Sequence, residues 1–402
     1  NACLLTNTVN SQSPWVTIWG GDGMSTAIAN DNSYILGSIY TGQIFTVNSN
    51  DDYIYQTPSF LGVSDFLFFT SFVIDPDSSK TLYLPALNKL WRKDNLIAAA
   101  FDKSLVEKGW KEISNNRLSN SDSISTLNIS SNNTNRLYFG TTKGKVYRID
   151  NANSNSTNLV EITGPNFPVN AYVSDIEIDP KNPDNVFVVF SNYNVQSIFY
   201  STDGGGNWAT EGGNLEENPD AGTGAGPSVR WLKMLYVQNE KIYFVGTSTG
   251  LYSTTELKGH KTQWVQEGSE TIGNVLVEMV DARESDGLVV IATQGNGVYS
   301  TNVSPISEVI NTNNTYAFDL EQNFPNPAKN ETNIKFALSE ADYIDLKIFN
   351  LRGNTALNVF SGFEQTGEHY FKVSTNELPD GIYLIYLRTS VGTLTKKMIV
   401  NK

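Results

Sequence analysis

Residues 186–208, VFVVFSNYNVQSIFYSTDGGGNW, decide the fold of this chain of 402 residues. They begin with an apolar run, Val186–Phe190, and continue through a polar turn into a second short strand, Ile198–Tyr200. A Gly-rich turn then leads to Trp208. Short apolar strands separated by clusters of Asn, Asp, Ser and Gly are typical of antiparallel sheets. This stretch therefore predicts three consecutive strands of one antiparallel sheet.

The same pattern recurs along the first three quarters of the chain. Aromatic residues of the second short strand lie 46 to 56 residues apart, at Phe45, Trp91, Tyr147, Phe199, Tyr252 and Tyr299. An apolar strand precedes each of them, and four units add a further strand that opens on Trp110, Leu159, Trp208 or Trp264. Each unit is a predicted sheet of four antiparallel strands and about fifty residues, a length typical of propeller blades.

Radial stacking of such sheets buries both of their faces, so the sequence predicts an all-β fold with a β-propeller of six visible blades. The last blade, which ends at Tyr299 and Ser300, lacks its outermost strand. Residues Trp15–Trp19 have the pattern of an outer strand that would close the ring on that blade. A second interpretation carries at least equal weight. The six blades would belong to a propeller of seven or more, with N-terminal sequence missing, because repeat arrays do not leave an open core at either end.

The turn before Trp208 carries a short motif. Ser201, Asp203, Gly205 and Trp208 match the Asp box, Ser-x-Asp-x-Gly-x-x-Trp. The propeller therefore resembles the BNR repeats of sialidase-like, sortilin-type and xyloglucanase-type proteins. Turn chemistry accounts for each motif residue, since Asp accepts backbone N–H bonds, Gly adopts a positive φ and Trp packs between sheets. We expect these four residues to stabilise the blade rather than to form a binding site.

Residues 319–402 carry an ordered series of motifs, with alternating strands such as Tyr343–Phe349 and Ile382–Arg388. The key residues of the series are Asn323, Pro325, Asn326, Pro327, Gly353, Gly381, Tyr383, Lys396 and Lys397. This series resembles the type A C-terminal sorting domain of cargo that the type IX (Por) secretion system of Bacteroidetes exports. The alternation of apolar and polar residues separately predicts a small Ig-like β-sandwich of about seven strands.

The resemblance divides the chain into three parts: a propeller over residues 1–303, a linker over 304–318 and a sorting domain over 319–402. It implies that the type IX machinery recognises the sorting domain after the chain has passed through the periplasm and across the outer membrane. The protein would then be secreted or held at the cell surface.

Composition argues against several classes of function. The chain has 28 Lys and Arg against 42 Asp and Glu, a formal net charge of −14, which argues against nucleic acid as a partner. One Cys and two His leave no disulfide framework and almost no material for a zinc site. No apolar run is long enough for a transmembrane helix. We expect no cofactor, and surface Ca²⁺ binding stays open with no ligands assigned.

Two carboxylates are candidates for catalysis. Asp22 precedes the first inner strand of a blade, and Asp175 occupies a comparable place in a later blade. Glycoside hydrolysis needs two carboxyl groups roughly 5 to 9.5 Å apart. The plainer interpretation of Asp22 is a turn residue that bonds its own backbone, because Gly-Asp-Gly is ordinary turn chemistry.

Two functions follow for the propeller. The first is a non-catalytic module that binds extracellular polysaccharide or a surface protein. Its candidate stacking residues, near loop boundaries, are Trp19, Tyr40, Tyr193 and Trp231. The alternative is a xyloglucanase-like glycoside hydrolase, in which Asp22 and Asp175 would supply the carboxylates.

Overall fold

The structure, a computed structural model, describes residues 2–6, 15–50, 52–114, 118–131, 134–220, 226–238, 240–303, 318–350, 355–389 and 393–402. The chain divides into two compact units, Asn1–Ile306 and Ser307–Lys402. Residues 304–317 of the predicted linker and Gly353 of the predicted sorting motif lie outside the described residues.

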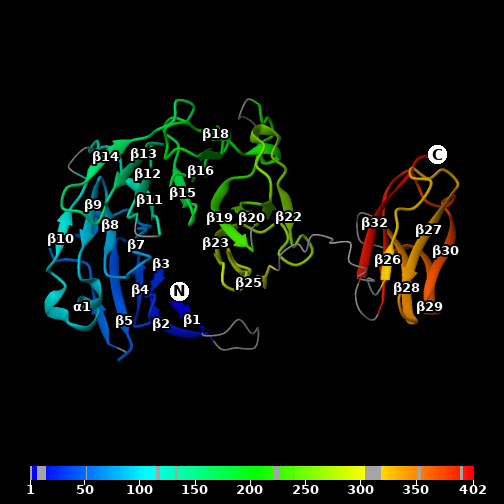
Figure 1. Cartoon of the computed structure of the whole chain (residues 1–402), viewed down its shortest axis with the longest axis horizontal. Coiled ribbons are helices and arrows are strands. Elements are labelled where there is room, and N and C mark those ends of the chain that lie inside the picture. The colour runs from blue at the N-terminus through cyan, green and yellow to red at the C-terminus, as the bar shows by residue number, and fades with distance from the viewer. Residues whose placement is uncertain are drawn as a thin grey trace. The chain divides into compact units, whose positions relative to one another are not determined.

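The first unit is a β-propeller of six antiparallel sheets that follow one another in chain order (Figure 1). The inner strands are β3 (Gly23–Ile28), β7 (Val73–Ile74), β11 (Ile124–Ile129), β15 (Val173–Ile178), β19 (Val229–Val237) and β23 (Val277–Arg283). The second strands are β4 (Tyr34–Ile39), β8 (Leu82–Ala86), β12 (Leu137–Thr141), β16 (Val186–Phe190), β20 (Glu240–Thr247) and β24 (Leu288–Thr293). The third strands are β5 (Gln43–Asn48), β9 (Lys89–Lys93), β13 (Val146–Asp150), β17 (Ile198–Ser201), β21 (Gly250–Thr254) and β25 (Gly297–Asn302). The fourth strands are β6 (Tyr53–Tyr55), β10 (Trp110–Glu112), β14 (Asn158–Glu161), β18 (Ala209–Thr210) and β22 (Val265–Glu267).

These strands confirm the predicted six blades. We number the blades 1 to 6 in chain order. Among the described residues, blade 6 has three strands, as the sequence indicated. The sequence analysis did not identify β6, a strand of only three residues, Tyr-Ile-Tyr.

The second strands are the most deeply buried part of the propeller. Every residue of β8, β12 and β16 is buried. A short, continuous apolar run is the pattern of a strand that is covered on both faces, here by the neighbouring blades. The apolar core therefore lies between the blades, in layers that repeat around the ring.

The inner strands share an irregularity near their start. The register against the second strand shifts in β3, β11, β15, β19 and β23. The first paired residues beyond the shift are Thr26, Thr126, Asp175, Trp231 and Met279. Bulges of this kind re-aim side chains and are common beside functional sites.

The predicted closure of the ring by Trp15–Trp19 is wrong. Strand β2 (Val16–Gly20) pairs with β1 (Ala2–Leu5) in a separate sheet of two strands. Trp19 packs edge-on against Phe45, with ring centroids 4.7 Å apart, and a Cβ on Gly37 would lie 1.8 Å from its ring. These contacts hold β2 against blade 1, and its strand partner is β1 rather than the third strand of blade 6.

The second unit is a β-sandwich of seven strands, which confirms the predicted fold. One sheet has the order β26-β27-β30 and the other β29-β28-β31-β32. The strands are β26 (Phe318–Leu320), β27 (Glu331–Leu338), β28 (Asp342–Asn350), β29 (Thr355–Glu364), β30 (Gly367–Ser374), β31 (Gly381–Arg388) and β32 (Thr393–Val400). The core between them includes Ile334, Phe336, Leu346, Ile385 and Met398, all buried.

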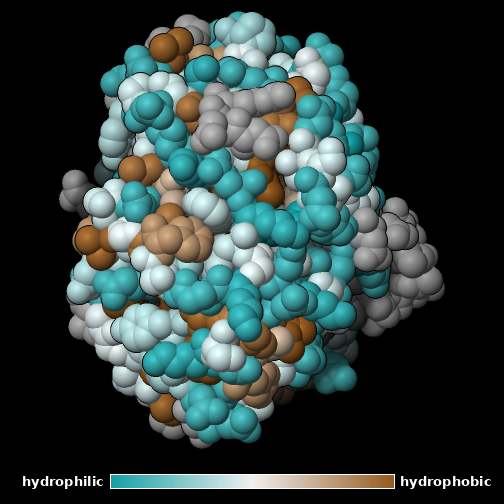
Figure 2. All heavy atoms as spheres, turned by 90° about the vertical axis from the view of Figure 1, so that its left-hand side faces the viewer, coloured by the Kyte–Doolittle hydropathy of each residue, from teal (hydrophilic) through white to brown (hydrophobic). Residues whose placement is uncertain are grey.

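Helices are few and short. The α-helix α1 (Leu96–Phe101) lies in blade 2, and the 3₁₀ helices are η1 (Val63–Asp65), η2 (Lys103–Leu105), η3 (Gly213–Leu215) and η4 (Gly259–Lys261). No helix in the described part of the chain has the length and apolar character needed to cross a membrane. The side that carries α1 and β10 is mostly hydrophilic, with hydrophobic residues in small separate patches (Figure 2).

Candidate functional site

The inner strands of the blades surround a central channel. Its upper part, at the end where the inner strands begin, is a cavity of about 350 Å³. The polar side chains of its wall include Ser25, Thr26, Ser71, Ser125, Ser174 and Asp175. Phe69, Trp231 and Met279 add apolar surface. A cavity with aromatic walls and a few placed polar groups is the usual form of a ligand site.

A layer of four polar side chains crosses the channel below this cavity. We call it the polar layer, and its members are Asn128, Glu177, Lys233 and Asp281. The Lys233 Nζ lies 3.5 Å from Glu177 Oε1 and 3.4 Å from Asp281 Oδ1. Asn128 Nδ2 donates to Glu177 Oε2 at 3.4 Å. A second cavity of about 290 Å³ lies beyond the layer and shares three of its residues, Asn128, Glu177 and Lys233.

The polar layer joins a buried carboxyl group, that of Glu177, to the partly exposed Lys233 and the exposed Asp281. Burial raises the pKa of Glu177, and the Lys233 ammonium partly opposes that rise. Glu177 in turn raises the pKa of Lys233. An ammonium between two carboxylates leaves the layer net negative.

Asp175, one of the two catalytic candidates, lines the upper cavity but is only 4% exposed. The backbone N–H of Leu232 donates to its Oδ2 at 2.9 Å, just as the N–H of Met234 donates to Glu177 Oε1 at 3.2 Å. Burial raises the pKa of Asp175 well above its usual range. The two carboxyl groups therefore tie the inner strand of blade 4 to that of blade 5.

Asp22, the other catalytic candidate, lies in the turn between β2 and β3. It is half-buried and stands outside the set of residues that line the channel. The structure does not bring Asp22 and Asp175 together on one cavity wall.

Aromatic side chains gather at the upper end of the channel. The connections β4–β5, β6–β7 and β16–β17 all lie at this end, because the inner strands begin there. Tyr40 and Phe68 stack with ring centroids 6.1 Å apart and are 40% and 63% exposed. Phe69 and Trp231 continue the aromatic surface into the cavity. Tyr193 is exposed in the β16–β17 connection, whereas Trp19 is buried against blade 1.

The sequence analysis missed Phe68, Phe69 and all four polar-layer residues. A comparison of the inner strands at one position would have found the layer. Asn128, Glu177, Lys233 and Asp281 each lie two residues beyond the residue that follows the register shift. Residues two apart on a strand point to the same side.

The turn at Ser201–Trp208 lies at the opposite end of blade 4. Gly205 N–H donates to Ser201 Oγ at 2.9 Å, and Asn207 N–H donates to Asp203 Oδ1 at 2.8 Å. The Asn207 and Ser201 hydrogen bonds lower the pKa of Asp203 to about 2. Trp208 Nε1 donates to the Ile162 carbonyl of blade 3 at 2.9 Å. These contacts stabilise the turn and join two blades, while the Asp-box assignment itself stays a prediction.

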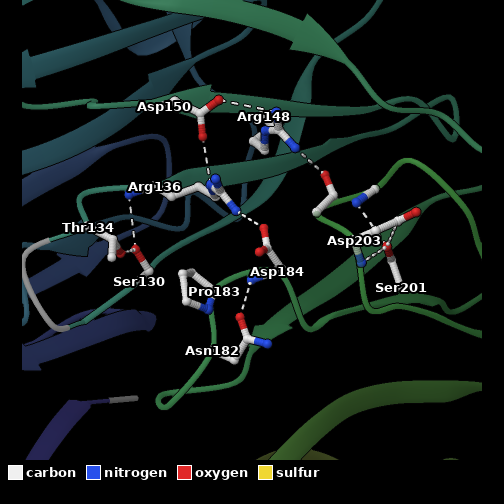
Figure 3. A network of polar contacts seen from close by, with 12 residues as sticks. Ser130, Thr134, Arg136, Arg148, Asp150, Asn182, Pro183, Asp184, Ser201 and Asp203 are labelled. Carbon is white, nitrogen blue, oxygen red and sulfur yellow. Dashed lines mark hydrogen bonds and ion pairs between the residues drawn. The ribbon is translucent and has the colours of Figure 1, made fainter.

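Arginine side chains reinforce the same end of the propeller. Arg148 of β13 donates to the Gly204 carbonyl of the turn at 2.6 Å, and Arg136 lies between Asp150 and Asp184 (Figure 3). Arg92 of β9 reaches the Ala152 carbonyl of the next blade at 2.8 Å in the same way. These arginines link consecutive blades and do not converge on a cavity.

The predicted sorting motif is hydrogen-bonded to the last strand of the sandwich. Asn326 accepts from the Ile399 N–H at 2.8 Å and donates to the Lys397 carbonyl at 3.0 Å. Asn323 Nδ2 donates to the carbonyl of Pro325 at 3.1 Å and to Thr332 Oγ1 at 2.8 Å. The segment before β27 is thereby fixed beside β32.

The remaining motif residues lie near this segment or in β31 and β32. Pro327 continues the segment, Gly381 opens β31, and Tyr383 is buried with its hydroxyl on the Pro379 carbonyl at 2.8 Å. Lys396 and Lys397 are exposed on β32. Within the described residues, no three His, Cys, Asp or Glu side chains form a group that would hold a metal ion.

Comparison with known families identifies the second unit. Residues 322–401 match the family model of the secretion system C-terminal sorting domain. The second unit is a type IX sorting domain. The chain is therefore exported by the type IX secretion system to the cell surface or the surrounding medium.

Solved structures similar to the chain are distant. PorZ, described as an essential bacterial surface component of the type IX secretion system of Porphyromonas gingivalis, is 13% identical, with a TM-score of 0.48. The match covers 94% of this chain and 52% of PorZ, so the chain spans about half the length of that relative.

Two other matches are to the β-propeller domain of Cps50 (Swd1) from Myceliophteria thermophila and to the dihydro-heme d1 dehydrogenase NirN. The first is 9% identical, covers 70% of this chain and 84% of that chain, and has a TM-score of 0.44. The second is 8% identical, covers 87% and 68%, and has a TM-score of 0.46. No curated protein matches the chain significantly.

Proposed function

We propose that the upper end of the propeller channel binds an extracellular polysaccharide of low charge. The observation that carries the proposal is the group of Tyr40, Phe68, Phe69 and Trp231 around a cavity with several hydroxyl groups. Aromatic faces suit the apolar faces of sugar rings, and hydroxyls suit their polar edges.

The negative charge of the protein restricts the class of polysaccharide that the channel would bind. The polar layer below the cavity has two carboxylates for one ammonium, and the chain as a whole has a formal charge of −14. A strongly anionic polysaccharide would be repelled by this surface. A neutral or weakly charged glycan is the ligand that fits.

The test is retention of the full-length protein on a panel of insoluble polysaccharides. Parent protein is expected to bind at least one neutral member. The double variant Phe68→Ala with Trp231→Ala should lose about tenfold in affinity, which corresponds to about 1.4 kcal/mol. Tyr343→Ala, which removes an exposed aromatic ring from the sorting domain, is the matched control and should bind like the parent. Binding to none of the panel would direct the search to a protein ligand and contradict the proposal.

The second candidate function is a glycoside hydrolase, and the raised pKa of Asp175 beside a cavity favours it. Its carboxyl group and that of Glu177 accept from N–H groups two residues apart, so the two groups lie roughly 7 Å apart along the strand. Release of reducing ends by the parent, lost in Asp175→Asn, would support hydrolysis. Asp22→Asn should keep any such activity, because Asp22 lies outside the channel lining.

The sorting domain has its own test. Deletion of residues 319–402 should leave the propeller in the periplasm. A substitution of Asn326 by Ala, which removes two bonds to β32, should reduce export without unfolding the propeller. Recovery of the deleted protein from the medium would contradict an export role for residues 319–402.

A further inference from the structure

The outer part of the space between blades 5 and 6 is an apolar cavity of about 470 Å³, which we call the blade 5–6 slot. Its lining includes Phe244, Leu251 and Ile272 from blade 5 and Val289, Ile291 and Tyr299 from blade 6. The volume lies within the range of small-ligand pockets, roughly 300 to 1,000 Å³.

Two of the corresponding spaces between earlier blades are filled by tryptophan. Trp208 lies between blades 3 and 4, with its ring centroid 5.0 Å from that of Phe167. Trp264 is buried between blades 4 and 5, where its Nε1 donates to the Glu211 carbonyl at 2.9 Å. Each Trp immediately precedes the fourth strand of its own blade.

Among the described residues blade 6 lacks that strand, and no described strand pairs with the outer edge of its third strand. β17 and β21 each pair with a fourth strand, whereas within the described residues β25 pairs with β24 alone. The three strands share the sequence Tyr-Ser-Thr, at Tyr200, Tyr252 and Tyr299. An unpaired edge beside an apolar pocket is the arrangement that accepts an added strand.

The chain itself has no aromatic residue at the matching distance. Trp208 and Trp264 lie 6 and 10 residues beyond Thr202 and Thr254 of that sequence. Beyond Thr301 the next aromatic residue is Tyr316, 15 residues on and only two before β26 begins. The residues that directly follow β25 therefore supply no strand with an aromatic first residue at that distance.

We propose that blade 6 binds one extended strand of another polypeptide, antiparallel to β25, with an aromatic side chain in the blade 5–6 slot. The partner is identified by this chemistry: an aromatic residue followed by a short β-strand, as in Trp264–Glu267 of blade 5. Main-chain hydrogen bonds to β25 supply affinity, and the slot supplies selectivity.

The slot differs from its counterparts at the carbonyl that would accept the hydrogen bond of an indole N–H. The carbonyl of Gly268, which follows the fourth strand of blade 5 as Glu211 follows that of blade 4, already accepts the N–H of Ile272 at 2.7 Å. The acceptor that matches the Glu211 carbonyl is therefore already engaged when an indole N–H arrives. The slot should therefore select ring bulk, and Phe should serve nearly as well as Trp.

The test uses the full-length protein and a labelled peptide with the sequence of residues 262–268, TQWVQEG, in a fluorescence anisotropy titration. We expect saturable binding, a loss of at least about tenfold when the peptide Trp is replaced by Ala, and a change within about threefold when it is replaced by Phe. Methylation of the peptide amides that face β25 should also abolish binding, because it removes ladder hydrogen bonds.

Protein variants locate the site. Thr301→Trp places a ring in the slot and should abolish binding, whereas Val298→Trp, on a residue of β25 outside the slot lining, is the matched control and should retain it. Equal thermal midpoints would show that both variants are folded. Binding that is insensitive to Thr301→Trp would overturn the proposal.

The competing occupant is the segment of this chain that follows β25. A variant with Ile306, Val309 and Ile310 replaced by Ser removes its aliphatic residues. Equal peptide affinity for parent and variant supports a partner strand. Binding only to the variant would show that the chain fills its own slot, and absence of binding to both would overturn the proposal as well.

Discussion

Blades 4 and 6 are built from the same repeat, yet they are held in the propeller by different forces. Blade 4 is joined to blade 3 by Trp208, Arg148 and Tyr138, each of which donates to a carbonyl across the boundary. Blade 6 meets blade 5 through apolar residues such as Val280 and Val289, with Lys233–Asp281 as a polar contact between their inner strands. This difference indicates that the fourth strand and the residue before it fix a blade to the preceding blade.

The largest expected effect is the loss of stability when the tryptophan of blade 4 is removed. Trp208→Ala should lower the free energy of unfolding by about 3–5 kcal/mol, because it opens a cavity and removes an indole hydrogen bond. Val298→Ala in blade 6 should cost less than about 0.5 kcal/mol, since that residue is half-exposed. All seven Trp residues lie in the propeller, so urea unfolding followed by Trp fluorescence reports on that unit. Equal losses in the two variants would contradict the comparison.

Two glycine substitutions distinguish the stability cost of tight packing between blades from the cost of backbone strain. Gly205 and Gly295 both have positive φ, +91° and +80°, so substitution by Ala costs each about 1–2 kcal/mol. A Cβ on Gly205 would lie 2.8 Å from the Ile162 Cβ of blade 3, whereas a Cβ on Gly295 would have no neighbour within 4 Å. Gly205→Ala should therefore cost about 1–3 kcal/mol more than Gly295→Ala. Urea unfolding of the two variants measures this difference in the free energy of unfolding. Equal losses would show that the Ile162 side chain of blade 3 moves to make room for the added Cβ.

The smallest expected effect concerns the tie from blade 4 to blade 5. Asp175→Ala leaves the Leu232 N–H without its acceptor and should cost about 1–2 kcal/mol. Asp175→Asn keeps an acceptor oxygen and removes the titrating group.

The pH dependence of that pair of variants has a definite sign. The folded-state pKa of Asp175 is raised, so the folded state binds its proton more tightly than the unfolded state does. The stability of the parent should therefore fall relative to Asp175→Asn as the pH rises above about 4. Glu177 is present in both proteins, so urea unfolding at several pH values isolates Asp175. A difference that does not change with pH would contradict the burial argument.

The sequence alone predicted the blades because their apolar second strands recur with turn residues between them. It also predicted the sandwich, whose strands alternate along the sequence. It did not predict the place of β2, because a strand pattern does not name its partner, and the small residue Gly37 decides where Trp19 packs. Only part of the candidate site could be predicted from the sequence. Asp175 was found in the channel, but its role as an inter-blade acceptor depends on a strand 57 residues away.

Hydrogen exchange of the full-length protein tests the central claim, that blade 6 presents an open third strand where blade 4 is closed. Peptides that cover β17 and β25 are compared by mass spectrometry under native conditions. The account predicts strong protection of β17, which has a strand on both sides, and fast exchange of those β25 amides that point away from β24. Protection of β25 equal to that of β17 would show that its outer edge is already paired and would contradict the account.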